Sequence, residues 1–117
     1  MFQEVKDALP VSGDGYDAQI IREIKACALD LTTSAEIVLP GVVAITRTQD
    51  PQTGAWTVTD TSTLTDELAI TAISIWCNMR IGNPPNYDNL LQAYESMKGS
   101  MRLSSAYNTP PAEEAEG

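Results

Sequence analysis

The side chains of this chain that could carry chemistry are its carboxylates and its two cysteines, because it contains no histidine. That absence excludes His-based catalytic triads, histidine metal ligands and the usual general base near neutral pH. Asp14 and Asp17 could suggest a calcium site, but the ligand spacing of an EF-hand is missing. Asp66 and Glu67 fit the start of a helix, where carboxylates meet the positive end of the dipole. These acids therefore favour loop and capping roles over catalysis.

Cys27 and Cys77 both fall on the apolar faces of predicted helices. Two cysteines alone do not make a structural zinc site, and free cysteine behaves as a small hydrophobe. Met1 to Leu9 has charged side chains and no apolar run, so no signal peptide is visible. We therefore expect two buried free thiols in a cytosolic protein.

The motif Gly13-Asp14-Gly15 lacks both the preceding strand and the third glycine of a phosphate-binding loop. With no histidine, metal cluster or phosphate loop, the sequence predicts a protein that is not an enzyme. We expect no catalytic residue, no cofactor, no metal ion and no small-molecule substrate.

The chain is strongly acidic, with sixteen acidic residues against seven basic ones and a net charge of −9. Proteins that coat DNA bind its phosphates through Lys and Arg, so this balance argues against that class. No segment approaches the apolar length of a membrane span, so we expect no membrane partner. Lys98 and Arg102 lie one helical turn apart and suggest a solvated face or, less simply, a contact for an acidic partner.

Four stretches repeat apolar residues at the three- and four-residue steps of a helix. We predict helices over about 2–9, 17–35, 65–81 and 88–103. Asp17 is a plausible N-cap of the second helix, and Thr63 or Thr65 of the third. The third helix is apolar on two sides, which is typical of a helix buried on more than one side.

Between the second and third helices the chain changes character. Residues 42–48 and 55–60 are rich in β-branched and aromatic side chains, and Asp50 to Gly54 between them has turn chemistry. This pattern predicts a β-hairpin inserted over about 42–60. An isolated hairpin is only marginally stable in water, so its apolar side chains need the helices or a neighbouring subunit.

The linker between the third and fourth helices is the most specific local motif. Gly82 is the expected helix stop, and the proline pair cannot continue a helix. Its residues are Asn83, Pro84, Pro85, Asn86 and Tyr87. A linker this short predicts that the two helices pack side by side.

The expected fold class is mainly α: a small antiparallel helical bundle with a hairpin insertion. One domain over 1–103 is followed by an acidic, proline-containing segment over 104–117, which we expect to be a flexible tail.

The order of these elements resembles the head-tail connector family of tailed bacteriophages. The resemblance covers about residues 3–107 and is most specific in Gly82 to Leu91, the linker and the start of the last helix. Further matching blocks are Asp17-Ala18-Gln19-Ile20, Ile24 to Leu31, Leu68 to Ile73, Trp76 to Met79, Tyr94-Glu95 and Lys98 to Arg102.

The resemblance implies a structural virion protein that forms a homo-oligomeric ring beneath the portal, at the head-tail junction. Such a ring extends the DNA channel and offers a docking surface for neck and tail completion proteins; DNA passes through without specific binding. The implied location is the virion, after assembly in the bacterial host cytoplasm.

Assembly of such an acidic chain needs apolar contacts, and a small core does not obviously bury every apolar side chain. The candidate interface residues are Val43, Ile45, Trp56, Val58, Ile70, Ile73, Tyr94 and Tyr107. The tail after Ser104 is a second candidate contact, since disordered segments can order on a partner.

Two other functions remain open. An acidic DNA mimic would inhibit a DNA-binding enzyme, but it needs a phosphate-like array of acids along one face. Here the acids look scattered through caps and loops. A generic helical interaction module from a prophage region would differ from a connector only in its partner.

Overall fold

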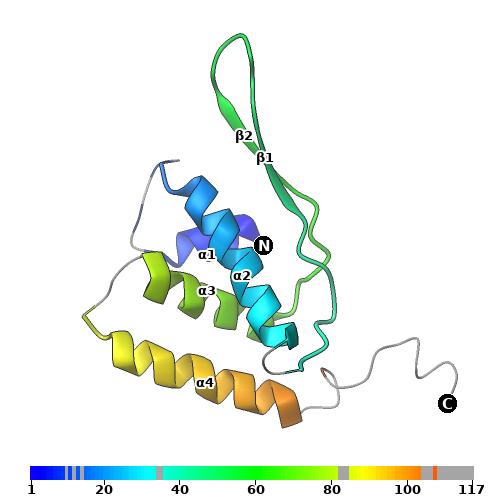
Figure 1. The fold of residues 1–117 in the computed structure, drawn as a ribbon, viewed down its shortest axis with the longest axis vertical. Helices are drawn as coiled ribbons and strands as arrows, with labels where there is room; N and C mark the ends of the chain where they lie inside the picture. Colours follow the sequence, from blue (N-terminus) through cyan, green and yellow to red (C-terminus); the bar gives the residue numbers. More distant parts are fainter. Residues whose placement is uncertain are drawn as a thin grey trace, which may run out of the picture.

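The computed structural model describes residues 1–9, 11, 13, 15–33, 36–81, 85–103 and 107. Its elements are α1 (Phe2–Asp7), α2 (Asp17–Thr33), β1 (Ile45–Gln49), β2 (Trp56–Asp60), α3 (Glu67–Ile81) and α4 (Tyr87–Leu103). Figure 1 shows the helices gathered in one body and the two strands as a hairpin that projects from it. The prediction of a mainly helical fold with a β-hairpin is confirmed.

The helix ends differ from the predicted ends for local reasons. The cap of α3 is Asp66, whose Oδ2 accepts a hydrogen bond from the Ala69 N–H at 3.0 Å, so the prediction of Thr63 or Thr65 was wrong. Asp17 is the first residue of α2 rather than its cap, and its carboxylate lies 2.7 Å from Lys6 Nζ. The predicted end of the second helix at 35 lies outside the described residues.

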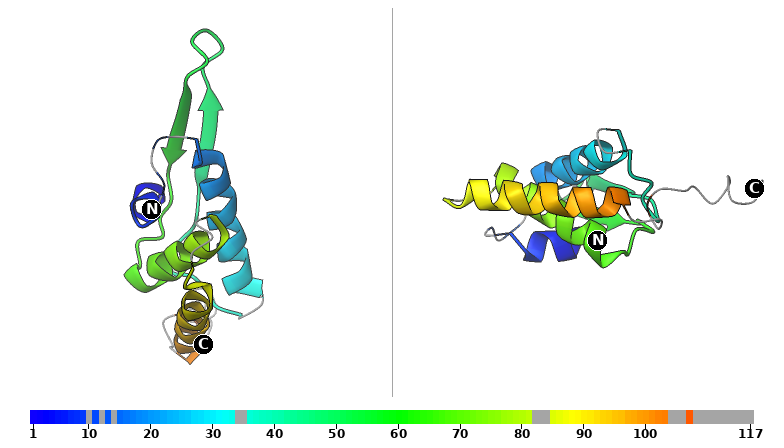
Figure 2. Two further views of the ribbon diagram at one scale, coloured as in Figure 1. Left: turned by 90° about the vertical axis from the view of Figure 1, so that its left-hand side faces the viewer. Right: turned by 90° about the horizontal axis from the view of Figure 1, so that it is seen from below.

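Helix α3 is the centre of the helical body, because α1, α2 and α4 all pack against it. Figure 2 shows it between α2 and α1 and above α4. Its buried residues are Ala69, Ile70, Ala72, Ile73, Cys77 and Met79. Burial on several sides matches the pattern of the sequence, and the prediction that α3 and α4 pack together is confirmed.

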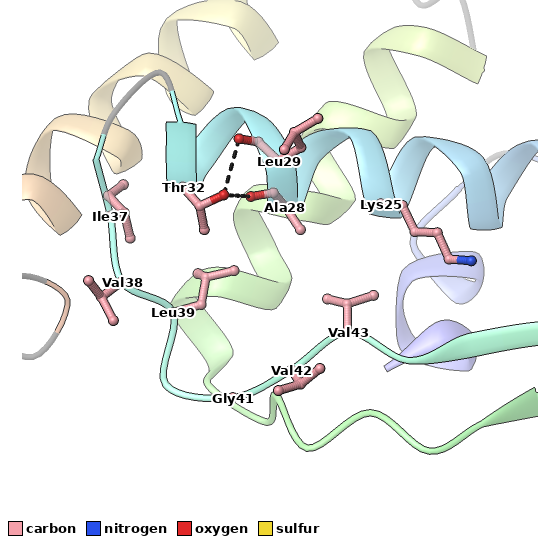
Figure 3. Close-up of a pocket in the computed structure, with 10 residues that line it drawn as sticks. All are labelled: Lys25, Ala28, Leu29, Thr32, Ile37, Val38, Leu39, Gly41, Val42 and Val43. Carbon is pink, nitrogen blue, oxygen red and sulfur yellow. Dashed lines mark hydrogen bonds between the residues drawn. The ribbon is translucent and has the colours of Figure 1, made fainter. Parts of the chain in front are cut away.

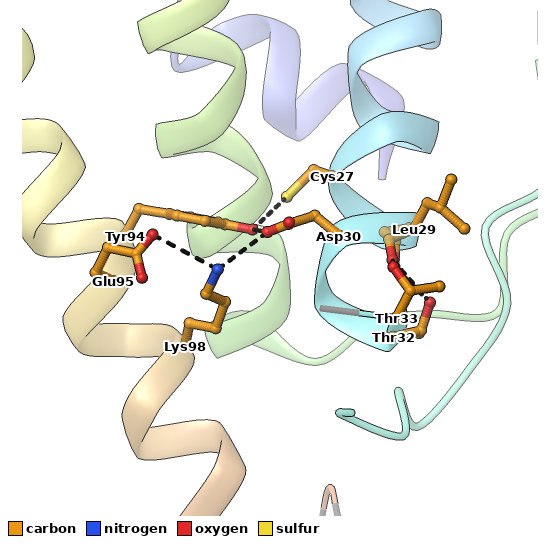
Figure 4. Close-up of polar contacts among 9 residues, drawn as sticks. Cys27, Leu29, Asp30, Thr32, Thr33, Tyr94, Glu95 and Lys98 are labelled. Carbon is orange, nitrogen blue, oxygen red and sulfur yellow. Dashed lines mark hydrogen bonds and ion pairs between the residues drawn. The ribbon is translucent and has the colours of Figure 1, made fainter. Parts of the chain in front are cut away.

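A polar cluster ties α2 to α4 within this packing (Figure 4). The Tyr94 hydroxyl donates to Asp30 Oδ2 at 2.6 Å, and Lys98 Nζ donates to the same oxygen at 3.2 Å. The Cys27 thiol lies 3.6 Å from the Tyr94 oxygen. Burial raises the pKa of Tyr94, and the bond to Asp30 adds to the effect. Lys98 is thus half-buried in an ion pair within the subunit, not on the solvated face expected from the sequence.

The hairpin has two chemically different faces. Antiparallel pairing sets Arg47 opposite Val58 and Gln49 opposite Trp56, so these side chains share a face with Ile45 and Asp60. The opposite face carries only threonines, namely Thr46, Thr48, Thr57 and Thr59. Its turn is closed by Asp50, whose Oδ1 accepts from the Gln52 N–H at 2.8 Å, and by Gly54 at φ +76°.

The chain on either side of the hairpin continues the pairing towards the helices. The N–H groups of Thr63 and Leu64 both donate to the Val42 carbonyl, at 2.9 and 3.2 Å. Gly41 lies so close to this stretch that a Cβ there would meet Leu64 Cα at 2.6 Å and Leu64 N at 2.7 Å. The two segments can approach this closely only because residue 41 has no side chain.

Asp60 fastens the base of the hairpin to α1. Its Oδ2 accepts from the Phe2 N–H at 2.7 Å, its Oδ1 accepts from the Ser62 N–H at 3.0 Å, and the Met1 amino group lies 3.2 Å away. Desolvation opposes ionisation, but the hydrogen bonds from Phe2 and Ser62 outweigh it and hold the pKa of Asp60 well below its usual range.

This depressed pKa predicts an acid-sensitive contribution to stability. A group whose pKa is lower in the folded state stabilises the fold above its unfolded pKa, which is about 3.9 for Asp. The contribution is lost as pH falls from that value through the folded pKa. We expect urea midpoints of the native chain to fall between about pH 5 and 3 more steeply than those of Asp60→Asn. Equal slopes would contradict the assignment, and Asp50→Asn at the hairpin turn is the matched control.

Candidate functional site

Most of the residues predicted to form a subunit interface are buried inside the subunit. Ile45, Ile70, Ile73, Tyr94 and Tyr107 all belong to the core, with Ile73 fully buried and Tyr94 only 1% exposed. The core holds these five because α3 contacts three helices and Ile45 packs into the same core, which corrects their prediction as interface residues. These five residues are therefore core residues rather than contact residues.

Tyr107 also corrects the predicted end of the packed domain at residue 103. Its hydroxyl donates to Asp66 Oδ2, and its carbonyl accepts from the Val38 N–H at 2.6 Å. Burial raises the pKa of Tyr107 to about 12, with the bond to Asp66 as the second cause. The core thus includes Tyr107, and the rest of the predicted tail lies outside the described residues.

The remaining interface candidates lie on or beside the hairpin. Trp56 is 45% exposed, and the Arg47 guanidinium stacks 3.8 Å from the centre of its ring. Val58 and Val43 are half-buried. Trp and Arg are the residue types that most often dominate binding energy at interfaces. The hairpin therefore presents one pair suited to a contact, on a segment that projects from the body (Figure 1).

The linker motif is only partly visible. Asn83 and Pro84 lie outside the described residues, while Pro85 and Asn86 are exposed and precede α4 directly. The Asn86 carbonyl accepts from the Leu90 N–H at 3.1 Å, and Tyr87 begins the helix with 43% of its surface exposed. The last residue of the linker motif, Tyr87, is thus the first residue of α4.

Two neighbouring surface hollows that the sequence analysis missed lie between α2 and the segment 37–47. Lys25 lines both, and we call them together the α2 furrow. Its larger part has a volume of about 610 Å³ and is shown in Figure 3. This part is lined by Lys25, Ala28, Leu29, Thr32, Ile37, Val38, Leu39, Gly41, Val42 and Val43. Its smaller part, towards the hairpin, is lined by Ala18, Ile21, Lys25, Ile45, Thr46 and Arg47.

The larger part of the furrow is apolar and open to solvent. Leu29 and Val42, from its two sides, are each 62% exposed. A turn at Glu36, which takes the left-handed φ of +57°, directs the chain back along α2, and the Ile37 N–H donates to the Leu31 carbonyl at 2.9 Å. Leu29 lies off the core stripe of α2, and that position was the available sequence signal.

The cations near the furrow lack the ion pairs that most other cations of the described residues form. Lys6, Arg80 and Lys98 form ion pairs with Asp17, Glu23 and Asp30, respectively. Arg22, Lys25, Arg47 and Arg102 form none with the described residues. Arg102 lies in the last turn of α4 and lines neither part of the furrow. Lys25 and Arg47 line the furrow, and Arg22 lies one helical turn before Lys25. On a chain of net charge −9, this side of α2 is locally basic.

The cysteines are buried and free, as predicted. Burial raises the pKa of Cys27 to about 12, and burial likewise raises that of Cys77. Within the described part of the chain no three His, Cys, Asp or Glu residues gather into a group that could hold a metal ion. None of the helices described is long and apolar enough to cross a membrane.

Comparison with known proteins found no matching family model, no matching curated protein and no matching solved structure.

Proposed function

We propose that this chain is a ring-forming head-tail connector: a structural subunit that docks under a phage portal, extends the DNA channel and carries neck or tail proteins. The proposal rests on the resemblance of the linker and helices to that family and on one structural observation. That observation is the projecting hairpin with its half-exposed Trp56 and stacked Arg47.

The hairpin supports an assembly role because its outer half, residues 48–57, is exposed in the described part of the subunit. Ile45 and Asp60 at its base are held by the core and by α1, whereas Gln49 and Thr57 farther out are exposed. The described molecule measures 53 × 37 × 19 Å, an elongated shape with the hairpin at one end of its long axis (Figure 2). Head-to-tail contacts between such subunits close into a ring when the rotation permits.

The charge distribution suits a channel protein better than a DNA mimic. Several acids are engaged inside the subunit: Asp17, Glu23, Asp30, Asp60 and Asp66 bind cations, backbone N–H groups or hydroxyls. Acids used in this way do not form a free array along one face. The remaining net negative charge repels DNA phosphates, which a passage for DNA requires.

Trp56→Ala should weaken self-association while leaving the fold intact. A buried interfacial tryptophan contributes about 2 kcal/mol or more, so we expect assembly to need about 30-fold more protein. Size-exclusion chromatography with light scattering over a concentration series measures this. Thr57→Ala, the next residue on the all-threonine face, is the matched control and should assemble like the native chain. An equal loss of self-association in both variants would show that the Trp56 face is not part of the interface.

The role itself is tested by mixing the chain with the portal protein of the phage or prophage whose genome encodes it. Negative-stain images should show a ring seated on the portal. Strictly monomeric behaviour at every concentration, together with no binding to the portal, would refute the connector function whatever the hairpin variants do.

A further inference from the structure

We infer that the α2 furrow is the docking site for the chain's own acidic segment, residues 110–116, which lies in it with its prolines on the apolar part and its glutamates on the basic part. The inference does not depend on the proposed ring assembly, although Arg47 belongs to both surfaces.

The first argument is where the described chain ends. Tyr107 is buried, and its carbonyl accepts a hydrogen bond from the N–H of Val38, a residue that lines the furrow. Tyr107 is therefore placed at one end of the furrow, and the sequence continues from it through residues 108–117.

The second argument is the order of chemistry along the furrow. Near Val38 the furrow is lined by aliphatic side chains, including Leu39 and Leu29. Figure 3 shows Ile37 and Val38 at one end and Lys25 at the other. Lys25 also lines the smaller hollow, whose lining includes Arg47. From Val38 onwards, the furrow thus changes from apolar to basic.

The segment has the same order. Moving away from Tyr107, it reads Pro110-Pro111-Ala112 and then Glu113, Glu114 and Glu116. Proline pairs favour an extended backbone that packs on apolar grooves at little entropic cost. Carboxylates complement Arg22, Lys25 and Arg47, none of which forms an ion pair with the described residues. The prolines therefore match the apolar part of the furrow, and the glutamates match its basic part.

The lengths also agree. Lys25 and Thr32 are separated by about 10 Å along α2, at 1.5 Å per residue. The six residues from Tyr107 to Glu113 span up to about 20 Å when extended. The glutamates can therefore reach Lys25 and the cations beyond it from the position of Tyr107. A tether this short gives a local concentration in the millimolar range, which favours binding within one chain over binding between chains.

A spin label on the segment tests the contact in the full-length chain. Ala115→Cys gives one reactive thiol, because Cys27 and Cys77 are buried with raised pKa values. In ¹⁵N-labelled protein we expect the label to cause loss of amide signal intensity at Leu29, Thr32 and Val42. Signals on the exposed side of α4, such as Gln92, should be unchanged. Reduction of the label should restore all intensities.

Charge reversal identifies the basic part of the site. Lys25→Glu, at an exposed position, should remove most of the intensity loss, and so should high salt. Arg102→Glu is the matched control, since Arg102 is also exposed but does not line the furrow. Equal effects of the two variants, no intensity loss, or a loss spread evenly over the surface would each overturn the proposal.

A mixed sample separates the two possible sources of the segment. Spin-labelled ¹⁴N protein is added to unlabelled ¹⁵N protein, so that only contacts between chains are seen. We expect no intensity loss at Leu29 or Val42. A loss equal to that in the single-chain experiment would assign the furrow to the segment of a second copy and overturn docking within one chain.

Discussion

Gly41→Ala should cost about 3 kcal/mol of unfolding free energy, at the upper end of the range for overpacking. The added methyl group would lie 2.6 to 2.9 Å from backbone atoms of Leu64 and Thr63. Backbone cannot swing aside as a flexible side chain does, so the two segments must separate. Separation weakens the bonds from Thr63 and Leu64 to the Val42 carbonyl and disturbs the buried Leu64. Urea denaturation followed by circular dichroism measures the change.

Gly99→Ala is the matched control, with the opposite expected sign. Gly99 lies inside α4, and a Cβ there has no atom within 4 Å beyond its own helix. Alanine should therefore stabilise the fold by about 0.5 to 1 kcal/mol. A small, equal effect of both substitutions would mean that residue 41 has room for a side chain.

Asp30→Ala should be similarly damaging, by about 3 kcal/mol, the lower end of the range for breaking a buried ion pair. The substitution removes the one carboxylate oxygen that accepts from both Tyr94 and Lys98. The Lys98 side chain, only 14% exposed, is left without this partner, and the buried Tyr94 hydroxyl loses its acceptor. We place the effect at the lower end because the Asp30 side chain is 24% exposed, so water partly replaces the lost contacts.

A double-mutant cycle distinguishes this coupling from a general loss of helix stability. Asp30→Ala combined with Lys98→Ala should cost clearly less than the sum of the two single changes, because the second change removes the unpaired charge. Asp88→Ala, at the exposed first turn of α4, is the single-site control and should cost at most about 1 kcal/mol. Strict additivity in the cycle would show that Asp30 and Lys98 do not interact.

The sequence predicts local elements well here because their signals are local. The periodic stripes of α2 and α3, and the turn chemistry of Asp50 to Gly54, identify the helices and the hairpin. The α3 cap was missed because Thr63, Thr65 and Asp66 are all good capping residues. Only the fold selects Asp66, by placing it within reach of both the Ala69 N–H and the Tyr107 hydroxyl.

The candidate surfaces were harder to predict, because exposure depends on contacts distant in sequence. From the sequence, Ile70 and Tyr94 were not expected to fit in a small core. In the structure α3 packs against three helices, and the Tyr94 hydroxyl donates to Asp30, 64 residues away in the sequence. Trp56, named from the sequence as an interface candidate, is 45% exposed, since the outer half of a hairpin has little to pack on. The α2 furrow was missed because it depends on the turn at Glu36, a left-handed residue that is not glycine.

The central position of α3 has a consequence for how the chain folds during synthesis. The ribosome delivers α1, α2 and the hairpin first, but the buried faces of α1 and α2 pack mainly on α3, which follows them. The growing chain therefore keeps Ile20, Ile24 and Cys27 without their full packing until residue 81 has left the exit tunnel. Folding of the helical body, and any assembly that depends on it, therefore waits until α3 has left the tunnel.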